Sequence, residues 1–351
     1  MNNVAAELNS VVTDLILSRR SPGRDDYDVL WTDLVDLGLR DVGLDEALGG
    51  SGGSLAELTQ VVATLAEHGV AVPIVEFSTG RWAQGVAGLQ PSNVIAVAGP
   101  ESPSEDGDLT DVVVPWGRYG DAVILERGTA VHVLDVDPNR LMHAESVSGE
   151  PLDVLPLTDV DWQSARSLPI HGSQLRRRLR VLRIAELVGA SRGAVDLSRR
   201  YVAQREQFGA PLVAIPAVAR NIALMRVSLR QGEAALVQAL AASETPPAEA
   251  VPDHAMFATT AALVTAERVS NEIAEIAHQV HGALGVTEEY PLHKLTRKIW
   301  AVRDLQPPAV DLQLALGGAV VEYGEEYLWS VTAAGVPGSR FEPTHDKETA
   351  L

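Results

Sequence analysis

The segment Tyr201-Val-Ala-Gln-Arg-Glu-Gln-Phe-Gly-Ala-Pro-Leu212 is the most informative part of this sequence. It has the pattern of a long helix that ends in a glycine turn, after which another helix begins. Arg205, Gln207 and Phe208 crowd around this turn, and Gly209 lets the chain reverse sharply. The segment therefore predicts a helix end at which a cation, an amide and an aromatic ring lie together.

A second segment, Gln279-Val-His-Gly-Ala-Leu-Gly285, has the same character. Gln279 offers an amide donor at the end of a predicted helix. Gly282 permits a close approach of a ligand to the backbone, and Ala283 is small enough not to block it. We expect this segment to supply backbone and amide contacts rather than charge.

Two interpretations of these segments are open. The Arg205 guanidinium is a planar fork of donors that suits a pyrophosphate, and the Phe208 ring could pack against an adenosine. The alternative is purely structural: Arg205 caps a helix end and Phe208 is a core residue.

Three sequence patterns follow one another along the chain. Residues 2–90 carry apolar residues at helical spacing, residues 91–168 hold short β-branched runs bounded by Gly, Pro and Asp, and long helical stripes then return. The clearest runs are strands at 94–97, 111–114, 122–125 and 130–134, and the helical stripe Ile184, Val188, Val195 and Val202. We expect a mainly α protein with a small β-domain: an N-terminal helical domain (1–90), a middle antiparallel β-domain (91–168), a C-terminal four-helix bundle (169–334) and a flexible tail (335–351).

Composition excludes several functions. The 47 acidic residues outnumber the 28 basic ones, and the formal charge of −19 disfavours binding to nucleic acid. The absence of cysteine excludes disulfides and thiolate chemistry, and the nine histidines lack carboxylate partners at metal spacing, so no metal site is expected. No apolar run approaches the length of a membrane span and no signal pattern opens the chain, so we expect a cytoplasmic protein without membrane contacts.

The two segments and the order of the elements together resemble the acyl-CoA dehydrogenase family. In that family the corresponding segments reach across a dimer interface and hold the ADP half of an FAD that is bound mainly to the neighbouring subunit. The resemblance assigns this clamp to six residues of this chain: Arg205, Gln207, Phe208, Gln279, Gly282 and Ala283. It implies FAD as a cofactor that is shared across a subunit interface, and an acyl-CoA as the substrate.

The resemblance fails at the catalytic base. Family members remove a proton from the carbon α to the thioester with a glutamate that follows a Tyr-Pro and an arginine, while a hydride leaves the β carbon for the flavin. Tyr290-Pro291 and Arg297 are present, but the glutamate position falls on Gln306, which Pro307-Pro308 follow. An amide cannot act as a carboxylate base, and prolines remove backbone donors. The alternative family position falls on about Leu179, which is not acidic either.

The chain therefore resembles the short non-catalytic subunits of actinobacterial heteromeric acyl-CoA dehydrogenases that degrade sterol side chains. This resemblance implies an α2β2 assembly in which a longer catalytic subunit supplies the glutamate, and a steroid thioester as one possible substrate. Two other functions stay open: a homo-oligomeric flavin monooxygenase on the same fold, or a scaffold subunit without flavin.

The run Arg176-Arg-Arg-Leu-Arg180, with Arg183 after it, concentrates positive charge in an acidic chain. One interpretation is contact with CoA phosphates or an acidic partner, and Arg180 aligns with an arginine that the family often keeps. The other interpretation is a solvated helix face. Asp304 could be a displaced base, but it would point away from the direction of Gln306 on a helix. We expect His281, inside the second segment, to form hydrogen bonds at the interface.

Overall fold

The computed structural model describes residues 3–19, 27–89, 93–97, 111–243 and 253–334. The main helices are α1 (Asn3–Ser18), α2 (Tyr27–Asp36), α3 (Leu55–Glu67), α4 (Ile74–Val86), α5 (Gly172–Gln204), α6 (Pro216–Ser243), α7 (His254–His281), α8 (Leu292–Asp304), α9 (Ala309–Tyr323) and α10 (Glu325–Ala334). The strands are β1 (Val94–Val97), β2 (Val112–Pro115), β3 (Ala122–Arg127), β4 (Ala130–Asp135), β5 (Met142–Glu145), β6 (Pro151–Leu155), β7 (Arg166–His171), β8 (Glu206–Gln207) and β9 (Ala210–Pro211). The predicted fold class, helices followed by a small β part and a helical bundle, is confirmed.

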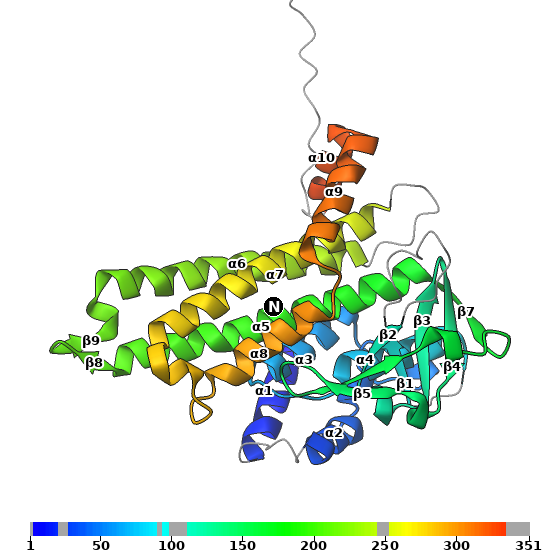
Figure 1. Cartoon of the computed structure of the whole chain (residues 1–351), viewed down its shortest axis with the longest axis horizontal. Helices are drawn as coiled ribbons and strands as arrows, with labels where there is room; N and C mark the ends of the chain where they lie inside the picture. The colour runs from blue at the N-terminus through cyan, green and yellow to red at the C-terminus, as the bar shows by residue number, and fades with distance from the viewer. Residues whose placement is uncertain (1–2, 20–26, 90–92, 98–110, 244–252, 335–351) are drawn as a thin grey trace, which may run out of the picture.

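The long helices α5, α6, α7 and α8 run side by side along the molecule, the β-sheets lie at one end, and the short β8–β9 hairpin forms the opposite tip (Figure 1). The helices α9 and α10 rise from one side of this bundle. α4 ends at Val86 before β1, and β7 ends at His171 directly before α5. The predicted domain limits at 90, 168 and 334 stay a prediction, and the predicted tail lies outside the described residues.

Helix α5 is the central element because apolar residues cover it on several sides. The predicted stripe of Ile184, Val188, Val195 and Val202 is buried as expected. The first half of α5 packs on α3 and α4, and the second half packs inside the bundle. Gly189 allows the backbones of α5 and α3 to touch, since a Cβ at this position would lie 2.1 Å from the carbonyl oxygen of Ala63.

The β part consists of two sheets, with the strand orders β1-β3-β4-β7 and β2-β6-β5, and an apolar core lies between them. The expectation of a purely antiparallel domain is wrong in one place: β1 pairs with β3 in parallel. Between these two strands the chain crosses to the other sheet through β2 and then returns. Because this connection is long, it allows β1 and β3 to run in the same direction. The tight turn at Gly128 instead forces β3 and β4 to be antiparallel.

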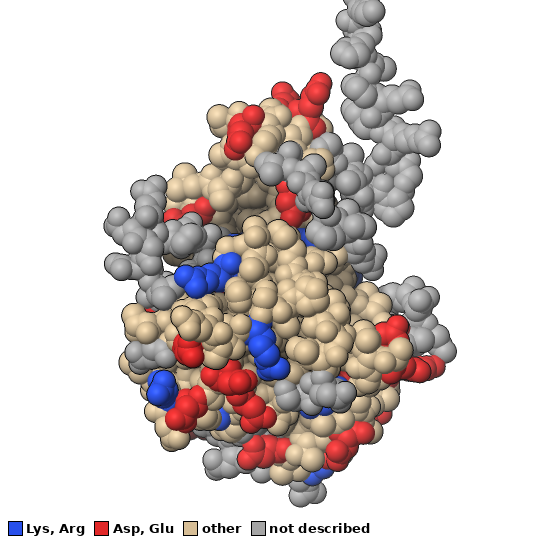
Figure 2. All heavy atoms as spheres, turned by 90° about the vertical axis from the view of Figure 1, so that its right-hand side faces the viewer, with Lys and Arg blue, Asp and Glu red and all other residues tan. Residues whose placement is uncertain are grey.

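Two local features concern the start of helix α3 and strand β5. Ser54 and Glu57 form the capping box that opens α3, with the Ser54 N–H donating to Glu57 Oε2 at 2.6 Å. The sequence does not indicate strand β5, because its four residues are exposed and include none of the β-branched or aromatic residues that mark a strand. On the molecular face that carries the sheets, acidic and basic side chains are scattered among uncharged ones (Figure 2).

Candidate functional site

An aromatic cluster brings the two signature segments together at one end of the bundle. Tyr201 in the last turn of α5 stacks on His281 at the end of α7, with 4.5 Å between ring centroids. Tyr290 closes the cluster, with its ring 4.9 Å from that of His281 and 5.9 Å from that of Tyr201. The segments lie far apart in the sequence, so this stacking fixes how their exposed residues are arranged relative to each other.

The buried His281 ring also forms two hydrogen bonds that fix its position in this cluster. Its Nδ1 donates to the carbonyl oxygen of Ala277 at 2.7 Å, and its Nε2 accepts from the Tyr290 hydroxyl at 3.2 Å. Burial lowers the pKa of His281, which favours the neutral ring that this pair of bonds requires. The predicted hydrogen-bonding role is thus observed within the chain; its place at a subunit interface stays a prediction.

The residues of the first segment face solvent. Arg205 follows the last residue of α5, and its side chain is exposed. Phe208 sits at the tip of the β8–β9 hairpin and is 94% exposed, with a φ of 56°. The alternative that Phe208 is a core residue is therefore wrong. A non-glycine residue in the left-handed region carries backbone strain, and here an apolar ring is also held in water.

The residues of the second segment also face outward. Gln279 is exposed, and its Oε1 accepts from Asn221 Nδ2 at 3.5 Å, which leaves its own amide N–H groups for another acceptor. Gly282 has φ 60° and ψ −140°, a conformation that favours glycine, yet a Cβ there would meet no atom of the described chain within 4 Å. Packing within the described chain therefore does not explain why position 282 lacks a side chain.

These observations test whether the predicted clamp suits an ADP group. The site offers a permanent cation at Arg205, an amide at Gln279, an exposed ring at Phe208 and an open backbone at Gly282 and Ala283. This donor set matches a diphosphate attached to an aromatic base. All of these groups point out of the chain, so they fit an FAD that is held mainly by another molecule.

The predicted base position lies at the C-terminal end of α8, whereas Tyr290 of the aromatic cluster lies just before the N-terminal end of this helix. Gln306 follows the C-terminus of this helix, and Pro307 and Pro308 lead into α9. An open groove of about 660 Å³ lies here between α7, the end of α8 and the start of α9. Asp304, considered above as a displaced base, is exposed and forms an ion pair with Arg303 at 2.7 Å.

One carboxyl in this groove was missed by the sequence analysis. Glu267 of α7 lines the groove together with Gln306 and is only 3% exposed. Burial raises the pKa of Glu267 to about 7, and among the described residues its Oε1 has no hydrogen-bond partner. No motif could have identified it, because its position depends on how α7 packs against the end of α8.

The arginine run is not a solvated helix face. Arg177, Arg178, Arg180 and Arg183 are all buried in α5. Nη1 of Arg180 donates to Thr260 Oγ1 and lies 2.9 Å from Met256 Sδ, both in α7. Contact of Arg180 with a substrate stays a prediction, since these bonds hold the side chain against its own chain.

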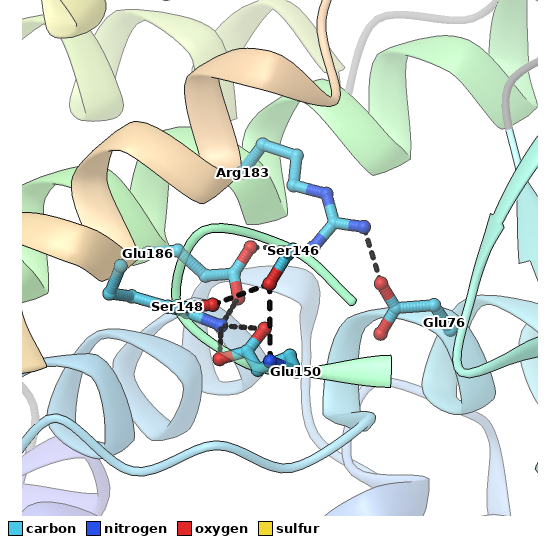
Figure 3. Close-up of polar contacts among 7 residues, drawn as sticks. Glu76, Ser146, Ser148, Glu150, Arg183 and Glu186 are labelled. Carbon is cyan, nitrogen blue, oxygen red and sulfur yellow. Dashed lines mark hydrogen bonds and ion pairs between the residues drawn. The ribbon is translucent and has the colours of Figure 1, made fainter. Parts of the chain in front are cut away.

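A buried ion network connects the three parts of the molecule, and the sequence analysis missed it (Figure 3). Arg183 of α5 forms ion pairs with Glu76 of α4 and, at 2.7 Å, with Glu186. Lys298 of α8 contacts Glu186 at 2.8 Å and Glu150, in the turn before β6, at 2.9 Å. The only available signal was the presence of charged residues in the first half of a helix whose apolar residues predict burial on several sides.

The network contains three carboxylates and two cations, so it carries one negative charge in excess when all five groups are ionised. Burial raises the pKa of Glu150, although Lys298 partly offsets this effect. Burial would also raise the pKa of Glu186, but Lys298 and Arg183 outweigh it and hold that pKa below its ordinary value. The two glutamates raise the pKa of Lys298 in turn. This arrangement holds α4, α5, α8 and the β5–β6 turn together and leaves its charged groups engaged with one another.

Comparison with known proteins identifies the bundle. Residues 176–303 match the family model described as the acyl-CoA dehydrogenase C-terminal domain. The C-terminal bundle of this chain is therefore similar to that of the acyl-CoA dehydrogenases. This family consists of oxidoreductases that use FAD. Sequence relatives include the acyl-CoA dehydrogenases IpdE2 (28% identical over 262 residues, 71% of this chain and 73% of the relative) and FadE27 (24% over 302 residues, 76% and 80%), both from Mycobacterium tuberculosis.

Solved structures agree over nearly the whole chain. A steroid acyl-CoA dehydrogenase variant, Tcur3481–Tcur3483, superposes with a TM-score of 0.78 at 20% identity over 91% of this chain and 98% of that one. The ChsE4–ChsE5 complex from Mycobacterium tuberculosis gives 0.74 at 17% identity over 92% and 98%. Butyryl-CoA dehydrogenase from Megasphaera elsdenii gives 0.68 at 15% identity over 92% and 99%. These likenesses confirm the acyl-CoA dehydrogenase fold.

Within the part of the chain that the structure describes, no group of three or more His, Asp or Glu side chains is arranged to hold a metal ion. No described helix is both long and apolar enough to cross a membrane.

Proposed function

We propose that this chain is the clamp subunit of a heteromeric, FAD-dependent acyl-CoA dehydrogenase. It would extend Arg205, Gln207, Phe208, Gln279, Gly282 and Ala283 toward the ADP half of an FAD on a longer catalytic subunit, which would supply the carboxylate base. The observation that carries the proposal is the contrast between the outward-facing clamp and the base position, where an amide stands before two prolines.

Each residue has a defined task in this proposal. The Arg205 guanidinium would neutralise and orient the diphosphate, the Gln279 amide would donate to it, and the Phe208 ring would cover the adenine and exclude water. FAD, when bound, accepts the hydride that leaves the β carbon of the acyl-CoA. The strain and exposure at Phe208 support the proposal, because a partner that covers the ring would recover apolar burial that the lone chain lacks.

The substrate and the assembly belong to the same proposal. Two similar structures are named as pairs of chains, and one of them is a steroid acyl-CoA dehydrogenase. We propose a steroid-derived acyl-CoA as the substrate and an α2β2 assembly with a longer relative. We propose that the protein is located in the cytoplasm.

The first test compares flavin content in the lone chain and in the pair that forms on co-expression with a longer relative. We expect the visible flavin absorption band in the purified pair and little of it in the lone chain. A strongly yellow lone chain that reacts with oxygen after reduction would favour the monooxygenase alternative. A colourless and inactive pair would contradict the proposal and favour a scaffold.

The second test is Arg205→Ala in the pair. A charge-assisted hydrogen bond contributes about 1.5–3 kcal/mol, so we expect flavin to dissociate at least tenfold more readily. Arg199→Ala is the matched control, since Arg199 is 61% exposed near the same helix end and contacts only its neighbour Asp196 among the ion pairs of the described chain. Equal flavin retention in both variants would contradict the clamp.

A further inference from the structure

The open groove at the C-terminal end of α8 has a buried carboxyl in its wall. Its volume of about 660 Å³ is in the range of small-molecule binding sites. The groove forms where Pro307 and Pro308 stop the helical path of α8, so that the chain turns into α9, which rises away from the bundle (Figure 1). Glu267 lines it from α7 with 3% of its surface exposed, and among the described residues its Oε1 has no hydrogen-bond partner.

A second buried acceptor lies one turn further along α7. Asn271 also lines the groove, and its Oδ1 is buried without a hydrogen-bond partner in the described chain. Residues four apart in a helix are neighbours on the same face, so Glu267 and Asn271 present two acceptors next to each other. A buried acceptor without a donor costs stability, and this cost is recovered when a donor enters the groove.

The basic side chains that line the groove are engaged with other groups. Nε and Nη2 of Arg303 both donate to Asp304 Oδ1, at 2.9 and 2.7 Å. Nη2 of Arg268 donates to Gln231 Oε1 of α6 at 3.0 Å. These two arginines therefore do not supply the donor that Glu267 Oε1 lacks.

The rest of the lining includes an apolar part beside the two acceptors. It consists of Val264, Pro307, Pro308 and Ala309. A ligand with an apolar body would bury surface against these residues while its polar group meets the acceptors. The formal charge of −19 makes the approach of a cation to this protein more favourable than that of an anion.

We propose that the groove between α7 and the start of α9 binds a primary organic amine, whose ammonium group donates to Glu267 Oε1 and Asn271 Oδ1 while its apolar body lies along Val264 and the two prolines. An ammonium group carries three N–H donors and a positive charge, so it satisfies both acceptors and neutralises the carboxylate. A hydroxyl group has one donor and no charge, and a carboxylate has no donor.

This site does not depend on the proposed flavin clamp. Glu267 and Gln279 lie roughly 18 Å apart along α7, at about 1.5 Å of rise per residue. Amine binding and flavin retention can therefore be measured separately, and the failure of one leaves the other standing.

The charge of Glu267 makes this binding depend on pH. Burial raises the pKa of Glu267 to about 7, and the positive charges of Arg303 on α8 and Arg180 on α5 offset only part of this shift. Arg268 and Asp304 are the other charged side chains that line the groove. Glu267 is then about one tenth ionised at pH 6 and about nine tenths ionised at pH 8, so the affinity for an ammonium group should be about ninefold higher at pH 8.

The test measures binding of hexylamine to the full chain by isothermal titration calorimetry, with hexanol and hexanoate as comparison probes of equal length. At pH 8 we expect hexylamine to bind at least about tenfold more tightly than hexanol, because its hydrogen bonds are charge-assisted, and hexanoate not to bind. Titrations at pH 6 in two buffers of different ionisation enthalpy should show that binding releases protons and is about ninefold weaker.

Two variants locate the binding in the groove. Glu267→Gln keeps the shape and removes the charge, so it should abolish both the tight binding of hexylamine and its pH dependence. Asn271→Leu removes the second acceptor and should weaken binding about tenfold. Glu272→Gln is the matched control, since Glu272 lies on the same helix but outside the lining of the groove, where it accepts from Ser228 Oγ at 2.8 Å. This control should keep the affinity and the pH dependence of the wild type.

Three outcomes would overturn the proposal. They are the absence of hexylamine binding to the wild type at pH 8, hexanol binding as tight as that of hexylamine, and hexylamine binding that survives in Glu267→Gln. Circular dichroism of each variant establishes that it is folded, and if Glu267→Gln does not fold, unchanged hexylamine affinity in Asn271→Leu would overturn the proposal in its place.

Discussion

The two ends of helix α5 differ in the exposure of their charged side chains. At its C-terminal end, Arg205 and the neighbouring Phe208 extend into solvent from a short hairpin. In its first half, Arg178, Arg180 and Arg183 are buried against α4 and α7. The same helix therefore carries exposed side chains that can contact another molecule at one end and buried charged side chains in its first half.

This difference shows what each end contributes. Exposed groups add little to the stability of the lone chain, because water already satisfies them. Buried ions are costly unless they are fully paired, so removing one partner has a large effect. Substitutions at the two ends should therefore separate stability from cofactor binding.

The largest effect is expected for Lys298→Met in the buried network. It would leave Glu150 and Glu186 without their shared cation, and we expect a loss of about 3–5 kcal/mol in the free energy of unfolding. Denaturant unfolding monitored by circular dichroism measures this loss. Lys294→Met on the exposed side of the same helix is the control and should change stability by less than about 0.5 kcal/mol. Similar values for both variants would contradict a stabilising network.

An intermediate effect is expected at Glu267, whose native pKa of about 7 exceeds its ordinary value of 4.5. Between about pH 4.5 and 7 the folded chain holds a proton that the unfolded chain has lost, so this group makes the fold less stable as pH rises through that window. Glu267→Gln should flatten the slope and stabilise the chain at pH 8 by on the order of 2–3 kcal/mol.

The same variant tests whether Glu267 takes part in catalysis. If the partner supplies the base, Glu267→Gln should leave turnover of the assembled pair unchanged. A loss of turnover of about a hundredfold or more would assign the base to this chain instead. Unfolding curves at several pH values and a steady-state assay of the pair measure the two quantities separately.

The smallest effect on stability is expected for Phe208→Gly. Glycine relieves the positive φ, which contributes up to about 1 kcal/mol, while its greater freedom in the unfolded chain offsets part of that gain. Flavin retention in the pair should nevertheless fall, because the ring is lost. Phe208→Ala keeps the strain and removes the ring, so it should lose flavin equally without any gain in stability. Unchanged flavin retention in both variants would remove Phe208 from the clamp.

Much of the fold could be predicted from local patterns. Helical stripes such as Ile184 to Val202 are long and periodic, and the capping residues Ser54 and Glu57 act within one turn. The exposed strand β5 and the parallel pairing of β1 with β3 could not be predicted, because they depend on the path that the chain takes between the two sheets. Local spacing carries no information on that path.

At the site, the amino-acid sequence was enough to identify the clamp candidates and the loss of the glutamate, because both depend only on residue types within short segments. These segments are Arg205 to Gly209, Gln279 to Gly285, and Gln306 before two prolines. The tertiary structure was needed to show that Phe208 is exposed rather than buried and that Lys298 neutralises glutamates from two other elements. It also shows that Arg178 is buried over Trp82, with no hydrogen-bond partner for its Nε and Nη2 among the described residues. The physical reason is that burial and pairing are set by segments that are distant in the chain, and in an arginine-rich helix the same residue type can be solvated, paired or unpaired according to what packs against it.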